Sequence, residues 1–445
     1  MAKSREIYVC QACGAESLQW QGKCPSCQAW NTLSLFREPK NVNAPRKKGK
    51  SEVWALQDVP SDSHHSFSCG FPSLDRVLGQ GMVLGGAYLI GGEPGIGKST
   101  LLLQIAGNVA KSGQKVLYAS GEEALSQIRL RASRLNMLHD NLFALATTHL
   151  DDIIEALEEM KPALLIVDSV QTISSSRAEG LSGNANQIRA VTNDLIEICR
   201  KLSTTLILVG HVTKDGVLAG PRLLEHMVDT VISLEGDRRQ IFRLLRIFKN
   251  RFGATEELLV FRMDTKGLEV IDDPSTFFLE ARDTSLSGAA VVMAVDGQRP
   301  LAVEVQALCT RSYLAIPRRT AVGFDVNRLH LLLAVLEKSV KVNFSHVDIY
   351  AKVGGGIKLQ EPGLDLGVVA AILSSFYDVA LPEKSIFWGE VDLNGQIRTC
   401  SRDSLRLSQA KRLQFSPLFY PVGDEKGGIA RLSDLKRALF PNSDM

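Results

Sequence analysis

The chain has 445 residues, which at ~150 residues per domain predicts about three units. Hydrophobic residues make up 45% and aromatic residues 6%, which supports sizeable cores and excludes a disordered or collagen-like chain. Lys and Arg number 51 and Asp and Glu 49, so the net charge of +2 neither favours nor excludes a nucleic-acid partner. Because the chain has no run of ~18 apolar residues and no secretory signal at its N-terminus, we expect a cytoplasmic protein without a membrane partner.

Residues 1–36 hold four of the eight cysteines, in two Cys-x2-Cys pairs separated by ten residues. Two such pairs place four thiolates around one Zn²⁺ at ~2.3 Å, and the metal supplies the folding energy that so short a segment lacks. No His or carboxylate completes an open coordination site, which indicates structural zinc. Two redox dithiols are the alternative, although the thioredoxin-like setting for them is missing. The predicted zinc ligands are Cys10, Cys13, Cys24 and Cys27.

Residues 37–65 are expected to form a linker. Their first part, residues 37–52, is polar, contains proline and shows no apolar period. It also carries a basic run, which is either a solvated tether or a contact for phosphates. The basic residues are Arg46, Lys47, Lys48 and Lys50.

From residue 66 to 272, short apolar runs alternate with amphipathic segments, a pattern typical of a mainly parallel α/β sheet. The apolar runs Phe242–Phe248 and Leu258–Met263 are bracketed by turns and predict an antiparallel extension. The other expected strands span Ala87–Ile90, Lys115–Ser120, Leu142–Ala146, Ala163–Asp168, Thr205–Val209 and Thr230–Leu234, and the expected helices span Lys98–Lys111, Ala124–Leu135, Asp151–Met160 and Ile188–Leu202.

A phosphate-binding loop follows the first of these strands, because residues 92–99 match G-x-x-x-x-G-K-[ST] at every fixed position. Its glycines let successive N–H groups point at phosphates, and the N-terminus of the next helix adds its positive dipole end. We expect Lys98 to reach the β- and γ-phosphates of ATP and the Ser99 hydroxyl to bind Mg²⁺. The predicted ATP site comprises Gly92, Glu93, Pro94, Gly95, Ile96, Gly97, Lys98, Ser99 and Thr100.

Two acids at the ends of other strands are candidates for the remaining chemistry. Asp168 ends an apolar strand, as the magnesium-binding acid of a Walker B strand does. Another strand ends in Gly121-Glu122-Glu123, where an acid would face the γ-phosphate and orient water. We prefer Glu122 for this role, and the pattern leaves Glu123 open.

A second boundary is expected near residue 272, so that residues 273–445 form a separate domain of helices and strands. The expected strands are Ala289–Val295, Leu301–Leu308, Ser385–Trp388 and Pro417–Tyr420, and the expected helices are Asn327–Lys338, Leu364–Phe376 and Leu405–Leu413.

Several long motifs resemble the RadA (Sms) family of bacterial DNA repair proteins. They are WQGKCPSCQAWNT in the cysteine unit, CGFPSLDRVL at residues 69–78, GEPGIGKSTLLLQ, YASGEEALSQIRLRA, and residues 210–237. The family is related to RecA recombinases and similar in mechanism to hexameric DnaB-type helicases. The resemblance implies an α/β chain with an N-terminal four-cysteine zinc ribbon-like unit, a RecA-like P-loop ATPase core and a C-terminal Lon-protease-like domain.

The same resemblance implies a function and partners. Members are ATP-driven motors on single-stranded DNA that promote branch migration of recombination intermediates in homologous recombination and repair. We therefore expect a DNA-dependent ATPase that forms a homo-hexamer, acts on branched intermediates and cooperates with a RecA-type recombinase.

Residues 249–253, Lys-Asn-Arg-Phe-Gly, match the family's KNRFG motif. In ring ATPases the site lies between subunits, and a neighbour supplies positive charge to the γ-phosphate. Lys249 and Arg251, two apart on an extended segment, would point the same way and act on the neighbouring subunit's nucleotide. The motif is also implicated in DNA binding, and the sequence does not separate the two roles. A basic turn between strands is the third alternative.

Two polar loops would line the channel of a hexamer and grip a single strand without reading bases. One follows Asp168, and the other follows the strand Thr205–Val209. His211 is either a sensor of the γ-phosphate or a structural residue. The candidates for DNA contact or nucleotide sensing are Arg177, Arg189, His211, Lys214, Arg222 and Asn250.

Residues from about 277 onward resemble the proteolytic domain of Lon, whose Ser nucleophile needs a Lys partner. The resemblance puts Asp365 at the Ser position and Ser404 at the Lys position, so we expect no peptidase activity and a scaffold for ring assembly. An outer DNA-binding surface or a solvated face is formed by Lys341, Lys352 and Lys358 with Gly354–Gly356.

Two other functions stay open. An ATP-dependent Lon-like protease is one, although the Ser–Lys pair is missing. A nucleotide-switched scaffold resembling the clock ATPase KaiC is the other, and binding of ATP with negligible turnover would favour it.

Overall fold

The computed structural model describes most of the chain and forms two compact units, residues 1–270 and 271–445. The expected linker, apart from its first and last residues, lies outside the described part, as do Cys13, Cys27, Lys214 and Arg222. Within the described part, no helix has the length and apolar character needed to cross a membrane. The described residues are 6–10, 16–25, 28, 30–37, 65–212, 218–219, 223–236, 242–255, 258–271, 275, 279, 282–297, 299–356, 358–423 and 428–441.

The cysteine unit is built on a small antiparallel sheet in the order β2-β1-β3. Strand β1 (Glu6–Cys10) pairs with β2 (Glu16–Ser17) and with β3 (Leu33–Arg37). Cys10, Cys24 and Leu33 are buried in one cluster against Tyr8. A segment of only about 36 residues buries too little apolar surface to be stable alone, which fits a requirement for metal.

A nine-stranded sheet forms the core of the first unit. Its order is β16-β15-β14-β13-β6-β10-β9-β7-β8, and the strands from β13 to β8 run parallel. Most of these strands are buried on both faces, which explains their nearly continuous apolar sequences. The parallel strands are β6 (Ala87–Gly92), β7 (Val116–Ser120), β8 (Leu142–Ala146), β9 (Leu164–Asp168), β10 (Thr205–Val209) and β13 (Thr230–Glu235).

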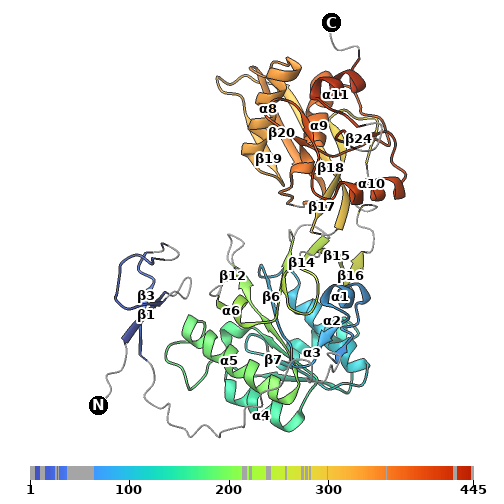
Figure 1. Cartoon of the computed structure of the whole chain (residues 1–445). Coiled ribbons are helices and arrows are strands. Elements are labelled where there is room, and N and C mark those ends of the chain that lie inside the picture. Colours follow the sequence, from blue (N-terminus) through green and yellow to red (C-terminus); the bar gives the residue numbers. More distant parts are fainter. Residues whose placement is uncertain are drawn as a thin grey trace, which may run out of the picture. The chain divides into compact units, whose positions relative to one another are not determined.

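Helices cover both faces of this sheet, as Figure 1 shows with α1 and α2 in blue on one side and α4 and α5 in green on the other. Alternate residues of β6 pack into separate cores: Tyr88 and Ile90 lie with α1, α2 and α3, whereas Ala87 and Leu89 lie with α4, α5 and α6. The helices are α1 (Pro72–Leu78), α2 (Lys98–Lys111), α3 (Leu125–Arg134), α4 (Leu150–Met160), α5 (Ala185–Leu202) and α6 (Leu223–Met227).

The predicted antiparallel extension is present on the other side of β13. Strand β14 (Phe242–Asn250) pairs antiparallel with β13 and β15 (Leu258–Asp264), and β16 (Gly267–Ile271) completes this edge. Short strand pairs connect the main elements. They are β4 (Ser66–Phe67) with β5 (Met82–Val83), and β11 (His211–Val212) with β12 (Leu218–Ala219).

The second unit contains a six-stranded mixed sheet in the order β19-β20-β18-β17-β21-β24. Strands β17, β18 and β20 pair antiparallel, whereas β19, β21 and β24 join in parallel. The strands are β17 (Ala289–Asp296), β18 (Arg299–Arg311), β19 (Arg319–Val322), β20 (Val347–Val353), β21 (Ile386–Phe387) and β24 (Leu418–Phe419), with a separate hairpin of β22 (Glu390–Val391) and β23 (Ile397–Arg398).

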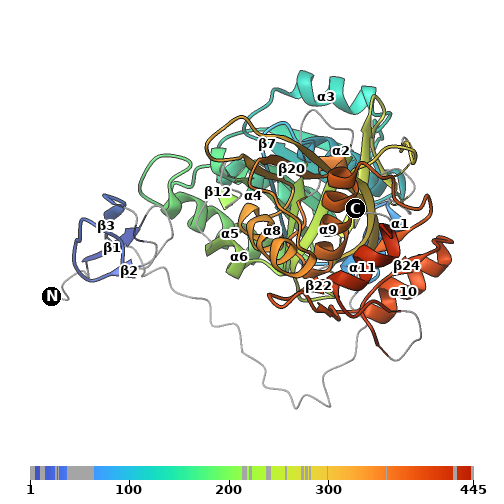
Figure 2. The same cartoon turned by 90° about the horizontal axis from the view of Figure 1, so that it is seen from above.

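Helix α9 (Asp365–Tyr377) is the central helix of this unit, and most of its residues are buried. Val292 of β17 packs against Gly367 of α9, while Val291 and Met293 pack with α10 (Asp403–Arg412) on the opposite face. Helices α8 (Val326–Val340) and α11 (Leu432–Leu439) lie beside each other, and α8 also contacts α9 (Figure 2). The two faces of the sheet therefore have separate cores.

Candidate nucleotide-binding site

The phosphate-binding loop connects β6 to α2 in the predicted position. Gly97 adopts a left-handed conformation with φ +116° immediately before α2, and a Cβ there would lie 2.5 Å from Met263 Cε. Gly95 also has a positive φ of 78°. Only glycine takes such conformations without strain, so the loop curls over the N-terminus of α2. This is an arrangement that binds anions.

Lys98 lies inside this loop and is only 5% exposed. Its Nζ donates hydrogen bonds to the Gly92 carbonyl at 2.7 Å and to the Glu93 carbonyl at 3.0 Å. The ammonium is therefore held within the loop by backbone oxygens of the same loop. A charged, glycine-lined loop at a helix N-terminus fits the phosphates of a nucleotide.

Strands β14 and β16 support the loop from outside. The buried Arg243 of β14 donates from Nε to the Ile96 carbonyl at 2.8 Å. Gln104 of α2 exchanges two hydrogen bonds with the backbone of Leu268, at 2.8 and 3.1 Å. Sequence reasoning missed Arg243, although a charged residue inside an apolar strand is a signal for such a role.

Asp168 ends β9, is almost fully buried, and is held by a tyrosine from the neighbouring strand. The Tyr118 hydroxyl donates to Asp168 Oδ2 at 2.5 Å. Burial, and then the negative charge of Asp168, raise the pKa of Tyr118 well above its usual value. Tyr118 therefore stays protonated at neutral pH and remains a donor that fixes the orientation of the carboxylate.

The two adjacent acids after β7, Glu122 and Glu123, have different side-chain partners. Ser120 Oγ accepts hydrogen bonds from the backbone N–H groups of both Glu122 and Glu123, at 3.3 and 3.1 Å. The Glu122 carboxylate accepts a hydrogen bond of 2.5 Å from Ser169 Oγ, next to Asp168. Glu123 instead forms an ion pair with Arg131 of α3. Glu122 is thus the acid that lies beside Asp168.

These residues gather at one edge of the parallel sheet. Strands β6, β10, β9 and β7 are neighbours in this order, so their carboxyl ends carry Lys98, Asp168 and Glu122 along a single line. His211 begins β11 directly beyond β10, where the Gly210 N–H bonds the Ile90 carbonyl at 2.9 Å. Ligands of open α/β sheets bind at this edge.

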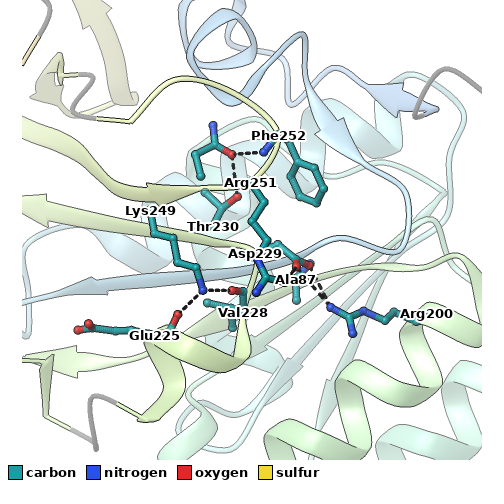
Figure 3. Close-up of polar contacts among 10 residues, drawn as sticks. Ala87, Arg200, Glu225, Val228, Asp229, Thr230, Lys249, Arg251 and Phe252 are labelled. Carbon is teal, nitrogen blue, oxygen red and sulfur yellow. Dashed lines mark hydrogen bonds and ion pairs between the residues drawn. The ribbon is translucent and has the colours of Figure 1, made fainter. Parts of the chain in front are cut away.

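Lys249 and Arg251 point to the turn between α6 and β13, as Figure 3 shows. Lys249 Nζ donates to the carbonyls of Glu225 and Val228, at 2.8 and 2.7 Å. Arg251 Nη1 pairs with Asp229 Oδ1 at 3.1 Å. Burial, and then the charge of Arg251, lower the pKa of Lys249.

Asn250 lies between Lys249 and Arg251, and its side chain forms hydrogen bonds within the same chain. Its Oδ1 accepts from the Thr230 hydroxyl and from the Phe252 N–H, both at 3.1 Å. Its Nδ2 donates to the Val77 carbonyl at 3.3 Å. This geometry makes Asn250 an anchor of the turn rather than a side chain that projects outward.

The KNRFG segment lies at the opposite end of β6 from the phosphate-binding loop. Asp229, the partner of Arg251, accepts from the backbone N–H of Ala87, the first residue of β6, at 3.0 Å. Gly92, which opens the loop, is five residues further along β6, a distance of ~17 Å. Within the chain, Arg251 therefore does not meet Lys98.

Of the DNA-contact candidates, Arg177 and Arg189 are exposed. Arg177 Nη1 pairs with Asp194 Oδ2 of α5 at 3.3 Å, and Arg189 lies on α5 itself. Gln187 holds the loop between them by donating hydrogen bonds to the Ala178 and Gly180 carbonyls, and it also bonds the Ser175 backbone. The loop after β9 is thus supported by α5.

In the second unit, Asp365 occupies the first position of α9 and is almost fully buried. Arg328 pairs with both of its oxygens, through Nε to Oδ1 and through Nη2 to Oδ2 at 2.7 Å, and the Val391 N–H adds a bond of 3.0 Å. Burial raises the pKa of Asp365, and Arg328 opposes this shift. Ser404 is exposed on α10. The carboxylate at the expected nucleophile position is therefore committed to an ion pair.

The described zinc-ligand candidates, Cys10 and Cys24, are both buried. Cys10 Sγ lies 3.1 Å from Thr32 Oγ1, and the Cys24 carbonyl accepts from the Gln28 N–H at 2.9 Å, closing a turn after this cysteine. Two thiols in one small cluster fit half of a tetrahedral zinc site.

Two protein families match parts of the chain. The family described as rubredoxin metal binding domain matches residues 8–34, and the family described as AAA domain matches residues 52–217. A solved KaiC-like protein from Pyrococcus horikoshii is similar in structure, with 20% identity, a TM-score of 0.40, and coverage of 46% of this chain and 99% of that chain.

Curated relatives match nearly the whole chain. A DNA repair protein RadA of Aquifex aeolicus is 44% identical over 421 residues, which is 95% of this chain and 94% of the relative. A DNA repair protein RadA of Bacillus subtilis is 42% identical over 433 residues, with 96% and 94% coverage. The chain therefore belongs to the RadA family of DNA repair proteins, with a zinc-ribbon unit, a RecA-like P-loop ATPase core and a Lon-like C-terminal domain.

Proposed function

We propose that this chain is a DNA-dependent ATPase that works as a homo-hexameric ring. It moves on single-stranded DNA and promotes branch migration of recombination intermediates, together with a RecA-type recombinase in the cytoplasm. The observation that supports this proposal best is the separation of Lys98 and Arg251 at opposite ends of β6. Because Arg251 cannot reach the nucleotide bound to its own subunit, we infer that its charge acts on the nucleotide of a neighbouring subunit.

In this proposal the loop from Gly92 to Thr100 holds the phosphates of ATP, with Lys98 on the β- and γ-phosphates. Ser99 and Asp168 would hold Mg²⁺, which would supply positive charge to the transferred phosphoryl group. Tyr118 keeps the Asp168 carboxylate in place. Glu122 orients the attacking water, because its carboxylate lies next to Asp168 whereas Glu123 is paired with Arg131.

Lys249 and Arg251 then complete the site of the adjacent subunit. Both side chains reach one turn, so they would face the neighbour together. Cations delivered in this way stabilise the charge that develops on the phosphoryl group. Rings of loops carrying Arg177, Arg189, His211, Lys214 and Arg222 would hold the DNA strand.

The ATPase rate with and without single-stranded DNA tests the function. We expect stimulation by a single-stranded oligonucleotide and no comparable effect of a polyanion such as heparin. A turnover rate that DNA leaves unchanged contradicts the proposal. ATP binding with negligible turnover and no translocation would instead favour a nucleotide-switched scaffold.

We further assign four segments to the chain: a zinc unit at 1–36, a basic linker at 37–65, the ATPase domain at 66–272 and the Lon-like domain at 273–445. The zinc is structural and is held by Cys10, Cys13, Cys24 and Cys27. Replacement of Cys24 by Ala should release zinc while the ATPase keeps its basal rate. Unchanged zinc content by atomic emission would contradict this ligand set.

The Lon-like domain serves as a scaffold for ring assembly rather than as a protease. The ion pair of Asp365 with Arg328 supports this, because a carboxyl group whose two oxygens are both paired with Arg328 offers no activated nucleophile. Lys341, Lys352 and Lys358 are exposed and remain candidates for an outer DNA surface. Degradation of casein by the purified protein would restore the protease alternative.

A further inference from the structure

The carboxylate that holds Arg251 is shared with a second arginine. Arg251 Nη1 lies 3.1 Å from Asp229 Oδ1, and Arg200 Nη2, from the last turn of α5, lies 3.4 Å from both carboxylate oxygens (Figure 3). The Ala87 N–H donates to Oδ2 at 3.0 Å. Two guanidinium groups from separate elements therefore meet one carboxylate.

The three side chains differ in their exposure. The Asp229 side chain is only 8% exposed, whereas the side chains of Arg251 and Arg200 are 57% and 52% exposed. Both arginine head groups can thus leave for solvent or for another partner, but the carboxylate cannot. An ionised carboxylate left without a cation in so buried a position is strongly destabilising.

One arginine is enough to neutralise Asp229. While both are present, Arg251 can move away and Arg200 still compensates the buried charge. Without Arg200, movement of Arg251 would leave Asp229 with the Ala87 N–H as its described hydrogen-bond donor. Arg200 therefore sets how readily Arg251 is released.

We propose that Asp229 is a holding site for Arg251 and that Arg200 is the positioning residue that lets Arg251 leave it for the phosphate of a neighbouring subunit's nucleotide. The proposal rests on the proposed function, in which Arg251 acts across a subunit boundary. Arg200 touches no nucleotide itself. It acts by keeping the carboxylate neutralised during the exchange.

Substitution of Arg200 by Met tests the proposal, because Met keeps the helix propensity and the apolar stem but removes the charge. In the full-length protein we expect kcat of the DNA-stimulated ATPase to fall about tenfold, with KM for ATP and the assembly state unchanged. Arg200→Lys should restore most of the rate, since a cation is again present. Lys201→Met is the control, because Lys201 is the next residue of the same helix and pairs with the exposed Glu197.

An unchanged kcat in Arg200→Met overturns the proposal, as does an equal loss in Lys201→Met. A loss that Arg200→Lys fails to restore at all also contradicts it. In an Arg251→Ala background, Arg200→Met should cause no further loss of kcat, because no arginine is left to be released from Asp229.

Thermal unfolding tests the shared carboxylate without any reference to turnover. Each single replacement, Arg200→Met or Arg251→Ala, leaves one cation on Asp229 and should lower Tm by only ~2 °C or less. The double replacement should lower Tm by clearly more than the sum, because it removes both arginines from the buried carboxylate and leaves only the weaker attraction of Lys249. Additive Tm changes would overturn the sharing.

The proposed function and the positioning role of Arg200 are contradicted by different results. Normal turnover in Arg251→Ala would remove the trans role of Arg251, and with it the proposed function. If Arg251→Ala is inactive while Arg200→Met is fully active, only the role of Arg200 is lost.

Discussion

The two ends of strand β6 carry opposite arrangements of charge. At the carboxyl end, Lys98 is enclosed by carbonyls of its own loop, and an acid from each of two further strands lies along the same edge. At the amino end, Arg251 is half exposed and rests on a buried carboxylate. The first end is suited to bind phosphates. The second end carries a half-exposed cation that is accessible to another molecule.

In the proposed function, this difference would leave a single subunit without a complete catalytic site. The phosphate-binding loop and Arg251 lie at opposite ends of β6, a strand that spans ~17 Å from Ala87 to Gly92. If Arg251 acts as proposed, hydrolysis would depend on a neighbouring subunit. In the proposed ring, it would couple turnover in one site to the position of the next subunit.

Removal of the charge at the carboxyl end should have the largest effect. Lys98→Ala takes the only side-chain ammonium of the loop away from the β- and γ-phosphates, so we expect ATPase activity to be abolished. Turnover and binding of a fluorescent ATP analogue are the measurements. Lys111→Ala, at the other end of α2 and exposed, is the control and should behave as wild type. Substantial turnover in Lys98→Ala would contradict the site.

Removal of the charge at the amino end should separate binding from turnover. Arg251→Ala should bind ATP as well as wild type but hydrolyse it about 100-fold more slowly or worse, because the developing charge loses a cation. Arg262→Ala removes an arginine from a surface ion pair with Glu269 and is the control. Weaker ATP binding with an unchanged kcat would mean that Arg251 contributes to ATP binding and not to hydrolysis, which contradicts its proposed role.

A smaller effect should follow from loosening Asp168. Tyr118→Phe removes the hydroxyl that donates to Oδ2, so we expect the Mg²⁺ concentration for half-maximal activity to rise about three- to tenfold. Tyr88→Phe is a matched control: Tyr88 is buried in the same sheet, and its hydroxyl accepts from the Val83 N–H instead. If both variants show the same Mg²⁺ dependence, Tyr118 is only structural.

Local patterns predicted the elements that position the loop. Helix α2 and strand β10 have the expected bounds, because an apolar strand, a glycine loop and a long amphipathic helix each leave a signal in consecutive residues. Helix α5 begins at Ala185, three residues before the expected start. Asn184 accepts a hydrogen bond from the Asn186 N–H and caps this helix, a signal that was readable in the sequence.

Strand β20 was missed although its residues alternate: Ile349, Ala351 and Val353 are buried, whereas Tyr350 is half-buried and Lys352 is exposed. Alternation of this kind is typical of a strand with one solvated face, and it was overlooked. Helix α11 was also missed, since it has only eight residues.

Contacts between distant residues could not be predicted from the sequence. Arg243 meets Ile96 across 147 positions, and Asp229 meets the Ala87 N–H across 142. Both depend on which strands are neighbours, and the strand order does not follow the chain order. The choice between Glu122 and Glu123 likewise depends on Ser169 and Arg131, which only the fold brings near.

Complementation of two inactive variants tests the division of the site most directly. Lys98→Ala retains Arg251, and Arg251→Ala retains Lys98, so a mixed ring contains some boundaries with both groups intact. Co-expression in equal amounts with random assembly gives a competent boundary with a probability of one half times one half, and we predict about a quarter of the wild-type ATPase rate. A mixed complex as inactive as each variant alone would contradict the account.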